Sequence, residues 1–204
     1  MPDKTRQTEA PLRNEYLPDQ ALVLEVRELA PGIRHFVLEF VDPVLRENFS
    51  YCSGQFLQVS LLGIGESPIS ICSPPTQKGS FELCVRETGN LTQALHRLQP
   101  GDSLWVRGPY GQGFPLVEMA GQDLIFIAGG IGLAPLRSAI DCAVCLNDEF
   151  GELTVLHGAR SPDFLLFSDE YETWRQSGRV ETIVDEAPPG WRGNIGVITA
   201  LLDL

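Results

Sequence analysis

Short apolar segments separated by turn residues fill the first half of the chain. Leu22–Val26 and Ile33–Phe40 have the texture of β-strands and flank the turn Ala30-Pro31-Gly32. The same texture predicts four further strands, at residues 55–61, 69–72, 80–86 and 103–106. Short strands joined by glycine and proline turns favour a small antiparallel barrel, which we place at residues 21–115.

Two segments depart from this β pattern. Residues 1–20 are polar and contain three prolines, so they predict a loosely ordered arm. In residues 91–98 the apolar side chains recur at helical spacing, and the segment ends at Pro100-Gly101. This segment predicts the one helix of the barrel.

From residue 116 onward the hydrophobic pattern becomes that of a parallel α/β sheet. Asp123–Ala128 is a nearly continuous apolar run, as expected of a strand buried on both faces. The elements that follow alternate: a helix at 135–146, a strand at 153–157, a helix at 164–176 and a strand at 180–184. This series predicts half of a doubly wound sheet over residues 116–204, in which 191–204 begin another helix. The boundary between the two lobes is expected near 115–122.

Composition narrows the classes of partner. The formal net charge of −12 argues against binding to nucleic acid or to an anionic membrane, because both depend on clustered Lys and Arg. The acidity leaves open a basic partner or an ordinary acidic surface, of which the second is commoner. No segment reaches the roughly 20 apolar residues of a membrane helix. Five cysteines without framework spacing, and an N-terminus without a signal-peptide pattern, favour reduced thiols in the cytoplasm.

A glycine-rich segment supplies the clearest candidate chemistry. Gly129-Gly130-Ile131-Gly132-Leu133-Ala134-Pro135 follows the buried strand and opens a helix, which is the context of a dinucleotide phosphate loop. Backbone N–H groups at a helix N-terminus attract phosphate, and a proline is tolerated there because its missing N–H would have no helical partner. The candidate cofactor-binding residues of this loop are Gly129, Gly130, Gly132, Ala134 and Pro135. An ordinary connecting loop is the alternative.

Three motifs in a fixed order extend this interpretation. Ser67-Pro68-Ile69-Ser70 comes first, then Gly101-Asp102 leading to Gly108-Pro109-Tyr110-Gly111, and finally the glycine-rich segment. Together they resemble flavoprotein reductases of the ferredoxin-NADP reductase superfamily, in which a flavin barrel precedes a nicotinamide lobe. The resemblance covers about residues 15–204. It implies a six-stranded antiparallel flavin-binding barrel followed by an incomplete doubly wound nicotinamide-binding lobe.

The first motif carries the implied flavin contacts. Its Pro68-Ile69-Ser70-Ile71 form resembles the electron-transfer subunits of dihydroorotate dehydrogenase and the gamma subunits of sulfhydrogenases and cytosolic nickel-iron hydrogenases. The strand backbone would bond the polar edge of the isoalloxazine, Ile69 would pack on the ring, and Ser70 would place a hydroxyl near it. Ile69 stands where the superfamily has an aromatic residue, and Ser67 where it has an arginine. Alone, the segment also fits a Ser/Pro turn entering a strand.

The resemblance implies a second flavin segment that begins at the end of the strand at 80–86. Its candidate FAD-binding residues are Cys84, Val85, Arg86, Gly89, Leu91 and Thr92. Arg86 would supply the pyrophosphate with the cation that Ser67 does not, and Gly89 would permit close backbone approach at a helix start. The alternative makes Asn90 an ordinary helix N-cap and Arg86 a solvated surface charge.

Two more segments match the superfamily. Leu98–Phe114 resembles the segment that closes the barrel near the flavin, and much of its role is architectural. His157–Phe167 resembles the second segment of the nicotinamide site, in which Gly158 and Arg160 would lie near the adenosine ribose. Arg160 suits a 2′-phosphate, yet the same family pattern occurs with NADH and with NADPH. The cofactor is therefore written NAD(P)H.

Other reactive side chains favour structural roles. Cys142 and Cys145 lie one turn apart in a predicted helix without a second pair, which favours core packing over a redox or metal site. The histidines are scattered and form no predicted metal site: His35, His96 and His157. An acidic group is expected on a solvated helix face: Asp169, Glu170 and Glu172. No catalytic residue is assigned, because the flavin would carry the chemistry.

The resemblance implies an electron-transfer subunit that uses FAD and NAD(P)H. Its partner would be an iron–sulfur or hydrogenase/reductase subunit in a hetero-oligomer. Family members continue past the position of Leu204 with two more strands, one of which ends in a Cys-Gly-Pro-Pro segment. We therefore expect a fragment, or a chain completed by another subunit, with an uncovered sheet edge. The alternative function is a noncatalytic flavin-binding or docking module of a larger redox complex.

Overall fold

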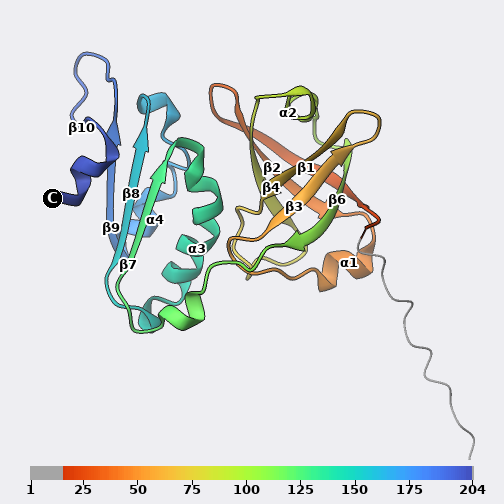
Figure 1. The fold of residues 1–204 in the computed structure, drawn as a ribbon, viewed down its shortest axis with the longest axis horizontal. Helices are drawn as coiled ribbons and strands as arrows, with labels where there is room; N and C mark the ends of the chain where they lie inside the picture. Colours follow the sequence, from red (N-terminus) through yellow and green to blue (C-terminus); the bar gives the residue numbers. More distant parts are fainter. Residues whose placement is uncertain (1–15, 204) are drawn as a thin grey trace, which may run out of the picture.

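The computed structural model describes residues 16–203, which form two lobes lying side by side (Figure 1). The first lobe is a six-stranded sheet with the order β4-β3-β6-β1-β2-β5, in which all pairs are antiparallel. Its strands are β1 (Asp19–Ala30), β2 (Ile33–Phe40), β3 (Phe56–Leu61), β4 (Gly65–Ser70), β5 (Phe81–Arg86) and β6 (Ser103–Tyr110). A bridge between Ile71 and Leu83 brings the two ends of this sheet together. The predicted antiparallel barrel is confirmed.

The barrel core comes from the inward-facing residues of these strands. Val23 of β1 and three side chains of β2, Phe36, Leu38 and Phe40, are almost completely buried. Phe40 also packs against Phe81 of β5, with the ring centroids 5.1 Å apart. Each large apolar side chain buried in this way contributes about 1.5–3 kcal/mol. The alternation along β1 and β2 therefore marks the core face of the sheet.

Within residues 16–115, the barrel lobe has two short α-helices rather than the one predicted. The predicted helix is α2 (Asn90–Leu95), which ends three residues earlier than expected. The additional helix is α1 (Pro43–Asn48), which starts where the Asp42 carboxylate accepts a hydrogen bond of 2.8 Å from the Val44 N–H. No residue of α1 is buried, so it has no apolar stripe from which periodicity could find it.

The second lobe is a four-stranded parallel sheet with the order β10-β9-β8-β7. Its strands are β7 (Leu124–Gly129), β8 (Leu153–Ala159), β9 (Gly178–Val184) and β10 (Asn194–Ile195). The α-helices are α3 (Leu133–Cys145) and α4 (Tyr171–Arg175). Short 3-10 helices are η1 (Leu116–Met119), η2 (Gly130–Gly132), η3 (Asn147–Glu149), η4 (Pro162–Phe164) and η5 (Ile198–Asp203). The predicted α/β lobe is confirmed.

Several element boundaries differ from the prediction. The helix expected at 164–176 is shorter than predicted and consists of α4 alone, preceded by η4. It cannot begin earlier because Phe167 adopts a left-handed φ of 52°, which interrupts a helix. The segment at 191–204 was expected to begin a helix, but its described part, residues 191–203, contains β10 and η5 and no α-helix. In the barrel, β4 begins four residues before the predicted strand at 69–72. β6 continues to Tyr110, where it still pairs with β3.

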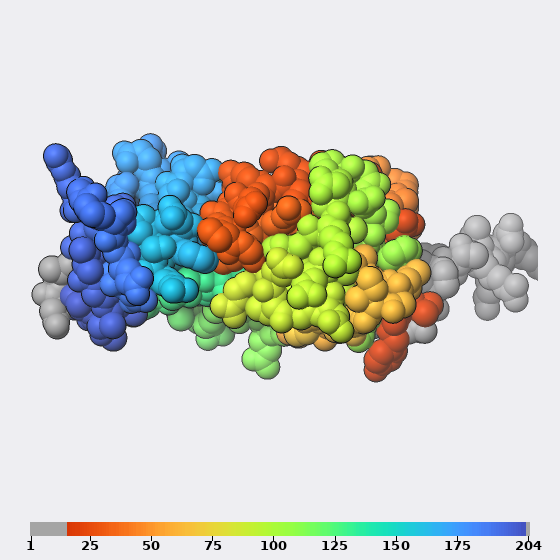
Figure 2. All heavy atoms as spheres, turned by 90° about the horizontal axis from the view of Figure 1, so that it is seen from above, coloured from red at the N-terminus to blue at the C-terminus, as the bar shows by residue number. Residues whose placement is uncertain are grey.

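The two lobes meet along one side of α3. Figure 1 shows α3 between the parallel sheet and the barrel, and Figure 2 shows β1 and β2 reaching the residues around 160–175. An ion pair of 2.8 Å between Arg27 and Asp169 crosses this contact. Most of the predicted N-terminal arm lies outside the described residues, and β1 begins at Asp19, just inside the arm's expected boundary. Within residues 16–203, no helix combines the length and the apolar character required to cross a membrane.

Candidate functional site

The first predicted flavin segment lies on β4. Ser67 pairs with Val59 of β3, and Ile69 pairs with Leu57. β4 stands at the end of the strand order, so among the described strands only its β3 side carries a full ladder. Pro68 is exposed, and a proline without an N–H donor is tolerated on such an edge strand. The free backbone edge beside half-buried Ile69 and Ser70 matches the requirement for bonding a flat heterocycle.

The second predicted flavin segment joins β5 to α2. The side chains of Cys84 and Val85 are buried, so only their backbone is open to a ligand, whereas Arg86 is exposed. The Ile71–Leu83 bridge is antiparallel, which places Ser70 beside Cys84 and brings the two segments to the same part of the barrel. Burial raises the pKa of the Cys84 thiol to about 12, so this thiol stays protonated.

Thr92 organises the turn that begins α2. Its Oγ1 accepts hydrogen bonds of 2.9 Å from the N–H groups of Thr88 and Gly89 and donates one to the Gly89 carbonyl. Gly89 is the N-cap of the helix, which corrects the alternative that gave this place to Asn90. Leu91 is buried in the barrel core, so its side chain anchors the helix. Thr92 thus shapes the predicted phosphate turn.

The predicted dinucleotide loop connects β7 to α3. Gly129 ends β7, Gly130–Gly132 form η2, and α3 starts at Leu133, two residues before the predicted start at Pro135. Pro135 still lies in the first turn, where an N–H has no helical partner. A Cβ added at Gly129, Gly130 or Gly132 would meet no atom of the described residues within 4 Å. The backbone of this loop is therefore open to a ligand, while the side chain of Ala134 is buried beneath it.

A cavity of about 270 Å³ lies at the C-terminal ends of the parallel strands. Its lining residues are Gly129, Gly130, Gly158, Ala159, Arg160, Asp185, Val197 and Ile198. Ligands bind at this edge of doubly wound sheets. Four of these lining residues were not among the predicted site residues: Ala159, Asp185, Val197 and Ile198. Of the four, Asp185 carries a usable signal, because it directly follows the strand β9. A Cβ at Gly158 would approach Ile198 to 3.0 Å, so Gly158 also serves packing.

His157 supports this loop from beneath. Its Nε2 lies 3.1 Å from the Gly130 carbonyl and its Nδ1 lies 2.7 Å from the Tyr171 hydroxyl. Burial lowers the pKa of His157 to about 4, against the opposing effect of the bond to Gly130, so the ring is neutral at pH 7. The ring ties the dinucleotide loop to α4, a role that was not assigned to it from the sequence.

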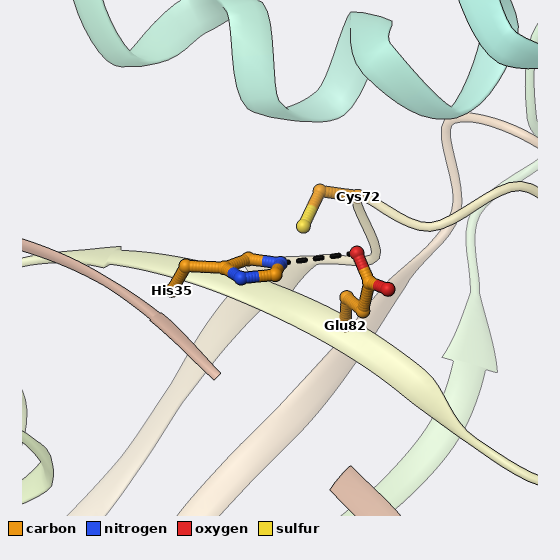
Figure 3. Close-up of side chains that lie close together, drawn as sticks. All are labelled: His35, Cys72 and Glu82. Carbon is orange, nitrogen blue, oxygen red and sulfur yellow. Dashed lines mark hydrogen bonds and ion pairs between the residues drawn. The ribbon is translucent and has the colours of Figure 1, made fainter. Parts of the chain in front are cut away.

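A polar cluster lies between the lobes (Figure 3). The ligand-type atoms of His35, Cys72 and Glu82 all lie within 4.8 Å of one another, although no histidine was expected in such a group. Glu82 Oε2 lies 3.0 Å from His35 Nε2 and accepts a 2.6 Å hydrogen bond from Arg137 Nη1. Burial alone would raise the pKa of Glu82, but the bond to His35 and the charge of Arg137 lower it to about 2. Glu82, with 12% of its side chain exposed, is therefore an ionised carboxylate at neutral pH.

Two other expectations need correction. Glu170 was placed on a solvated helix face, but its two carboxylate oxygens accept hydrogen bonds of 2.7 and 2.8 Å from Arg137. Cys142 is buried beside the Ser53 hydroxyl, as core packing requires, whereas Cys145 is exposed at the end of α3. Pairing of buried charges depends on tertiary structure, so spacing along the chain did not indicate it.

Family models match both lobes. The model described as an oxidoreductase FAD-binding domain matches residues 20–114, and the oxidoreductase NAD-binding domain matches residues 126–203. The sulfhydrogenase 1 gamma subunit of Pyrococcus furiosus is 43% identical over 173 residues, which are 85% of this chain and 59% of the relative. A probable dihydroorotate dehydrogenase B (NAD(+)) electron transfer subunit of Methanocaldococcus jannaschii is 33% identical over 84% of this chain and 58% of the relative. The chain thus spans less than two thirds of these relatives.

Solved structures share the two-lobe arrangement. The ferredoxin reductase in carbazole 1,9a-dioxygenase has a TM-score of 0.77 at 20% identity, covering 92% of this chain and 56% of the other. The cytochrome b5 reductase domain of Ulva prolifera nitrate reductase has a TM-score of 0.73 at 19% identity, covering 92% of this chain and 81% of the other. At such identities these likenesses establish the fold.

Proposed function

Because the chain belongs to the oxidoreductases that join an FAD-binding domain to an NAD-binding domain, we propose that it is the cofactor-binding part of an electron-transfer subunit. Bound FAD would exchange a hydride with NAD(P)H and single electrons with an acceptor, chemistry that belongs to the flavin. The residues of this chain would bind and orient the two cofactors.

The open face of the dinucleotide loop is the observation that carries the proposal. Gly129, Gly130 and Gly132 leave their backbone uncovered at the start of α3, beside the 270 Å³ cavity. Free N–H groups and the helix dipole at such a position attract phosphate. We assign the pyrophosphate of NAD(P)H to this loop, with Ala134 and Pro135 forming the helix start behind it.

FAD would occupy the barrel at the joined β4 and β5 segments. The backbone edge at Ser67–Ser70 would bond the isoalloxazine, and the turn from Arg86 to Thr92 would take the pyrophosphate. Arg86 is the exposed cation of this turn, and Thr92 holds two of the turn's N–H groups in place. The residues present thus fit a flavin dinucleotide, although position 67 is a serine rather than an arginine.

Opposite charges line the nucleotide cavity. Arg160 favours a 2′-phosphate, whereas the carboxylate of Asp185 favours a ribose hydroxyl and repels a phosphate. The cavity therefore does not select between NADH and NADPH by charge alone, and the proposal keeps NAD(P)H.

The electron acceptor is proposed to be an iron–sulfur or hydrogenase/reductase subunit in a hetero-oligomer. The support is that the relatives are themselves named as subunits of a sulfhydrogenase and of a dihydroorotate dehydrogenase. All five cysteines are free thiols, which supports a reducing compartment, and we propose the cytoplasm.

Two measurements on the purified chain test the proposal. Titration with FAD should quench flavin fluorescence and saturate at one FAD per chain, and anaerobic addition of NADH or NADPH should then bleach the flavin absorbance. A chain that takes up no FAD would contradict the proposal. A chain that binds FAD but is not bleached by either nucleotide would instead favour a noncatalytic flavin-binding or docking module.

A further inference from the structure

We propose that Arg137 is a positioning residue that holds the two lobes, and with them the two cofactor-binding segments, at one fixed separation. Arg137 lies on α3 of the nucleotide lobe, with only 10% of its side chain exposed. The functional consequence rests on the cofactor assignment proposed above, whereas the fixed separation of the lobes does not.

The contacts of the Arg137 guanidinium cross the boundary between the lobes. On the barrel side, Nη1 donates 2.6 Å to Glu82 Oε2 and 3.0 Å to the Cys72 carbonyl. On its own side, Nε and Nη2 donate 2.7 and 2.8 Å to the two oxygens of Glu170. Such a two-pronged bond fixes the plane of the guanidinium, so Glu82 meets it in one orientation.

Aromatic packing holds the same group from another side. The guanidinium carbon lies 4.8 Å from the centroid of the Phe167 ring, and the His35 ring meets Phe167 edge-on at 5.8 Å. His35 belongs to the barrel and Phe167 to the nucleotide lobe, so this contact crosses the boundary too. Phe167 adopts a φ of 52°, which costs energy for a residue other than glycine. The surrounding contacts maintain that conformation.

The place of the Arg137 contacts in the fold explains why they bear on function. Glu82 lies on β5, two residues before the flavin segment that begins at Cys84, and Arg137 lies two residues after Pro135 of the dinucleotide loop. The bond from Arg137 to Glu82 is therefore a short connection between the two cofactor-binding segments. Hydride transfer requires the reacting atoms at about 3–3.5 Å, so a small displacement of one lobe lowers its rate.

A metal ion is a less suitable explanation for the buried cluster. His35, Cys72 and Glu82 are metal-ligand types, and Figure 3 shows their side chains converging below α3. However, the Glu82 oxygen that faces His35 already bonds the positive charge of Arg137. Burial also raises the pKa of the Cys72 thiol, which opposes the thiolate that a metal requires. Arg137 supplies the cation of this cluster.

The first experiment measures the separation of the lobes directly. Spin labels are attached at Ile64→Cys in the barrel and Glu172→Cys in the nucleotide lobe, with exposed Cys52 and Cys145 changed to Ser. We expect one narrow distance distribution for this chain and a broad one after Arg137→Met. Arg137→Met leaves the carboxylate of Glu170 without its partner, which could prevent folding. The double variant Arg137→Met/Glu170→Gln removes that unpaired charge, and the same distance measurement is made on it if Arg137→Met does not fold. An unchanged distribution in the folded variant would overturn the proposal.

The second experiment compares cofactor binding with flavin reduction. For Arg137→Met we expect an FAD dissociation constant within about threefold of the parent, but flavin reduction by NAD(P)H that is about 10–100-fold slower. Arg137→Lys keeps the charge without the two-pronged bond and should give an intermediate rate. Arg179→Met is the matched control, because Arg179 pairs with Glu181 within one strand. It should leave both measurements unchanged.

The possible outcomes separate this inference from the proposed function. A broadened distance distribution with an unchanged reduction rate would overturn the positioning role of Arg137. A parent chain that takes up no FAD, or is not bleached, would contradict the proposed function, while the distance measurement would still decide whether Arg137 fixes the lobes.

Discussion

At the scale of single residues, the buried ring of His157 couples the dinucleotide loop to α4. Its two nitrogens face the Gly130 carbonyl and the Tyr171 hydroxyl, and that hydroxyl also donates 2.9 Å to the Leu166 carbonyl. A neutral imidazole has one N–H, so the ring donates a hydrogen bond to either the Gly130 carbonyl or the Tyr171 hydroxyl, but not to both at once. The ring stays neutral because burial disfavours its charged form.

His157 should make stability depend on pH below neutrality. Its pKa is about 4 in the folded chain and 6.5 when unperturbed, so the unfolded state binds more protons between these values. The contribution of His157 to the free energy of unfolding is therefore fully present above pH 6.5. About 3 kcal/mol of this stabilisation is lost as the pH falls to 4. Urea unfolding of the parent and His157→Gln at pH 7, 5.5 and 4 should give a stability difference that changes by this amount. A difference that stays constant with pH would contradict the prediction.

The pH test compares the parent with His157→Gln because Asp141 changes the stability with pH in the opposite direction. Burial raises its pKa to about 6, so the folded chain holds a proton there that the unfolded chain releases. Both proteins in the comparison keep Asp141, and its effect cancels from the difference.

Arg86 should supply part of the FAD affinity. It is exposed at the end of β5, next to the turn that Thr92 organises. Arg86→Ala should weaken FAD binding by about 1.5–3 kcal/mol, the range of a hydrogen bond to a charged group. Fluorescence titration measures the change, with exposed Arg97→Ala of the same lobe as the control. Equal affinities for the two variants would return Arg86 to the solvated-surface interpretation.

At the scale of elements, the segment after β6 requires glycine at a close approach to the barrel. Gly113 has a φ of 78°, and a Cβ there would lie 2.9 Å from the Cys52 Cβ and the Ser53 carbonyl. At Gly113 the close neighbours are barrel atoms.

Gly113→Ala should therefore lower the stability of the chain by more than the backbone strain of a positive φ would do alone. The matched control is Gly121→Ala, because Gly121 has a similar φ of 75° but open space around its Cβ position. Gly113→Ala should cost about 1–3 kcal/mol more than the control, the usual penalty for overpacking. Chemical unfolding of both variants measures this difference. If the two costs agree, steric crowding by the barrel contributes nothing.

The pattern of apolar residues predicted elements best where tertiary burial is extensive. β7, α3, β8 and β9 lie within a few residues of their predicted positions, because Leu124, Val155 and their neighbours are core residues. α1 was missed because it buries none of its residues. α4 was predicted too long because the left-handed conformation of Phe167 leaves no trace in hydrophobic periodicity.

At the scale of the whole molecule, one face of the parallel sheet is left partly uncovered. Leu124 and Ala128 of β7 are buried, whereas Ile125 and Ile127 on the opposite face are 62% and 46% exposed. β7 is also the last strand in the sheet order. Parallel sheets are normally covered on both faces, and an apolar edge strand promotes association.

This exposed face of β7 should drive self-association. Ile125→Lys/Ile127→Lys should lower the association constant and the binding of a hydrophobic dye, because charges at an edge strand oppose pairing. Sedimentation velocity over a concentration series measures the first effect. Leu62→Lys/Ile64→Lys makes the same chemical change at exposed positions between β3 and β4 and should have no effect. Equal effects from both pairs would show that net charge alone is responsible.

The arrangement of lobes was predictable in order, but their junction was not. Two features predicted that the barrel precedes the α/β sheet along the chain. These are the turn-rich first half and the glycine-rich loop that follows a buried strand. The pairing of Arg137 with Glu82 and Glu170 joins residues 55 and 33 positions apart, so periodicity carries no information on it. The same holds for Ile198, which reaches the nucleotide cavity only after the sheet has formed.

The pairing of β1 with β6 constrains the order in which the protein folds. Asp19 lies opposite Val106, and Leu22 lies opposite Ser103, so the barrel joins residues more than 80 positions apart. During synthesis on the ribosome, β1 and β2 emerge first and wait for β6 before the barrel can close. Contacts so distant along the chain slow folding and leave apolar strands exposed meanwhile. The neighbouring strands of the nucleotide lobe follow one another along the chain, so this lobe can assemble strand by strand as β7 to β10 emerge.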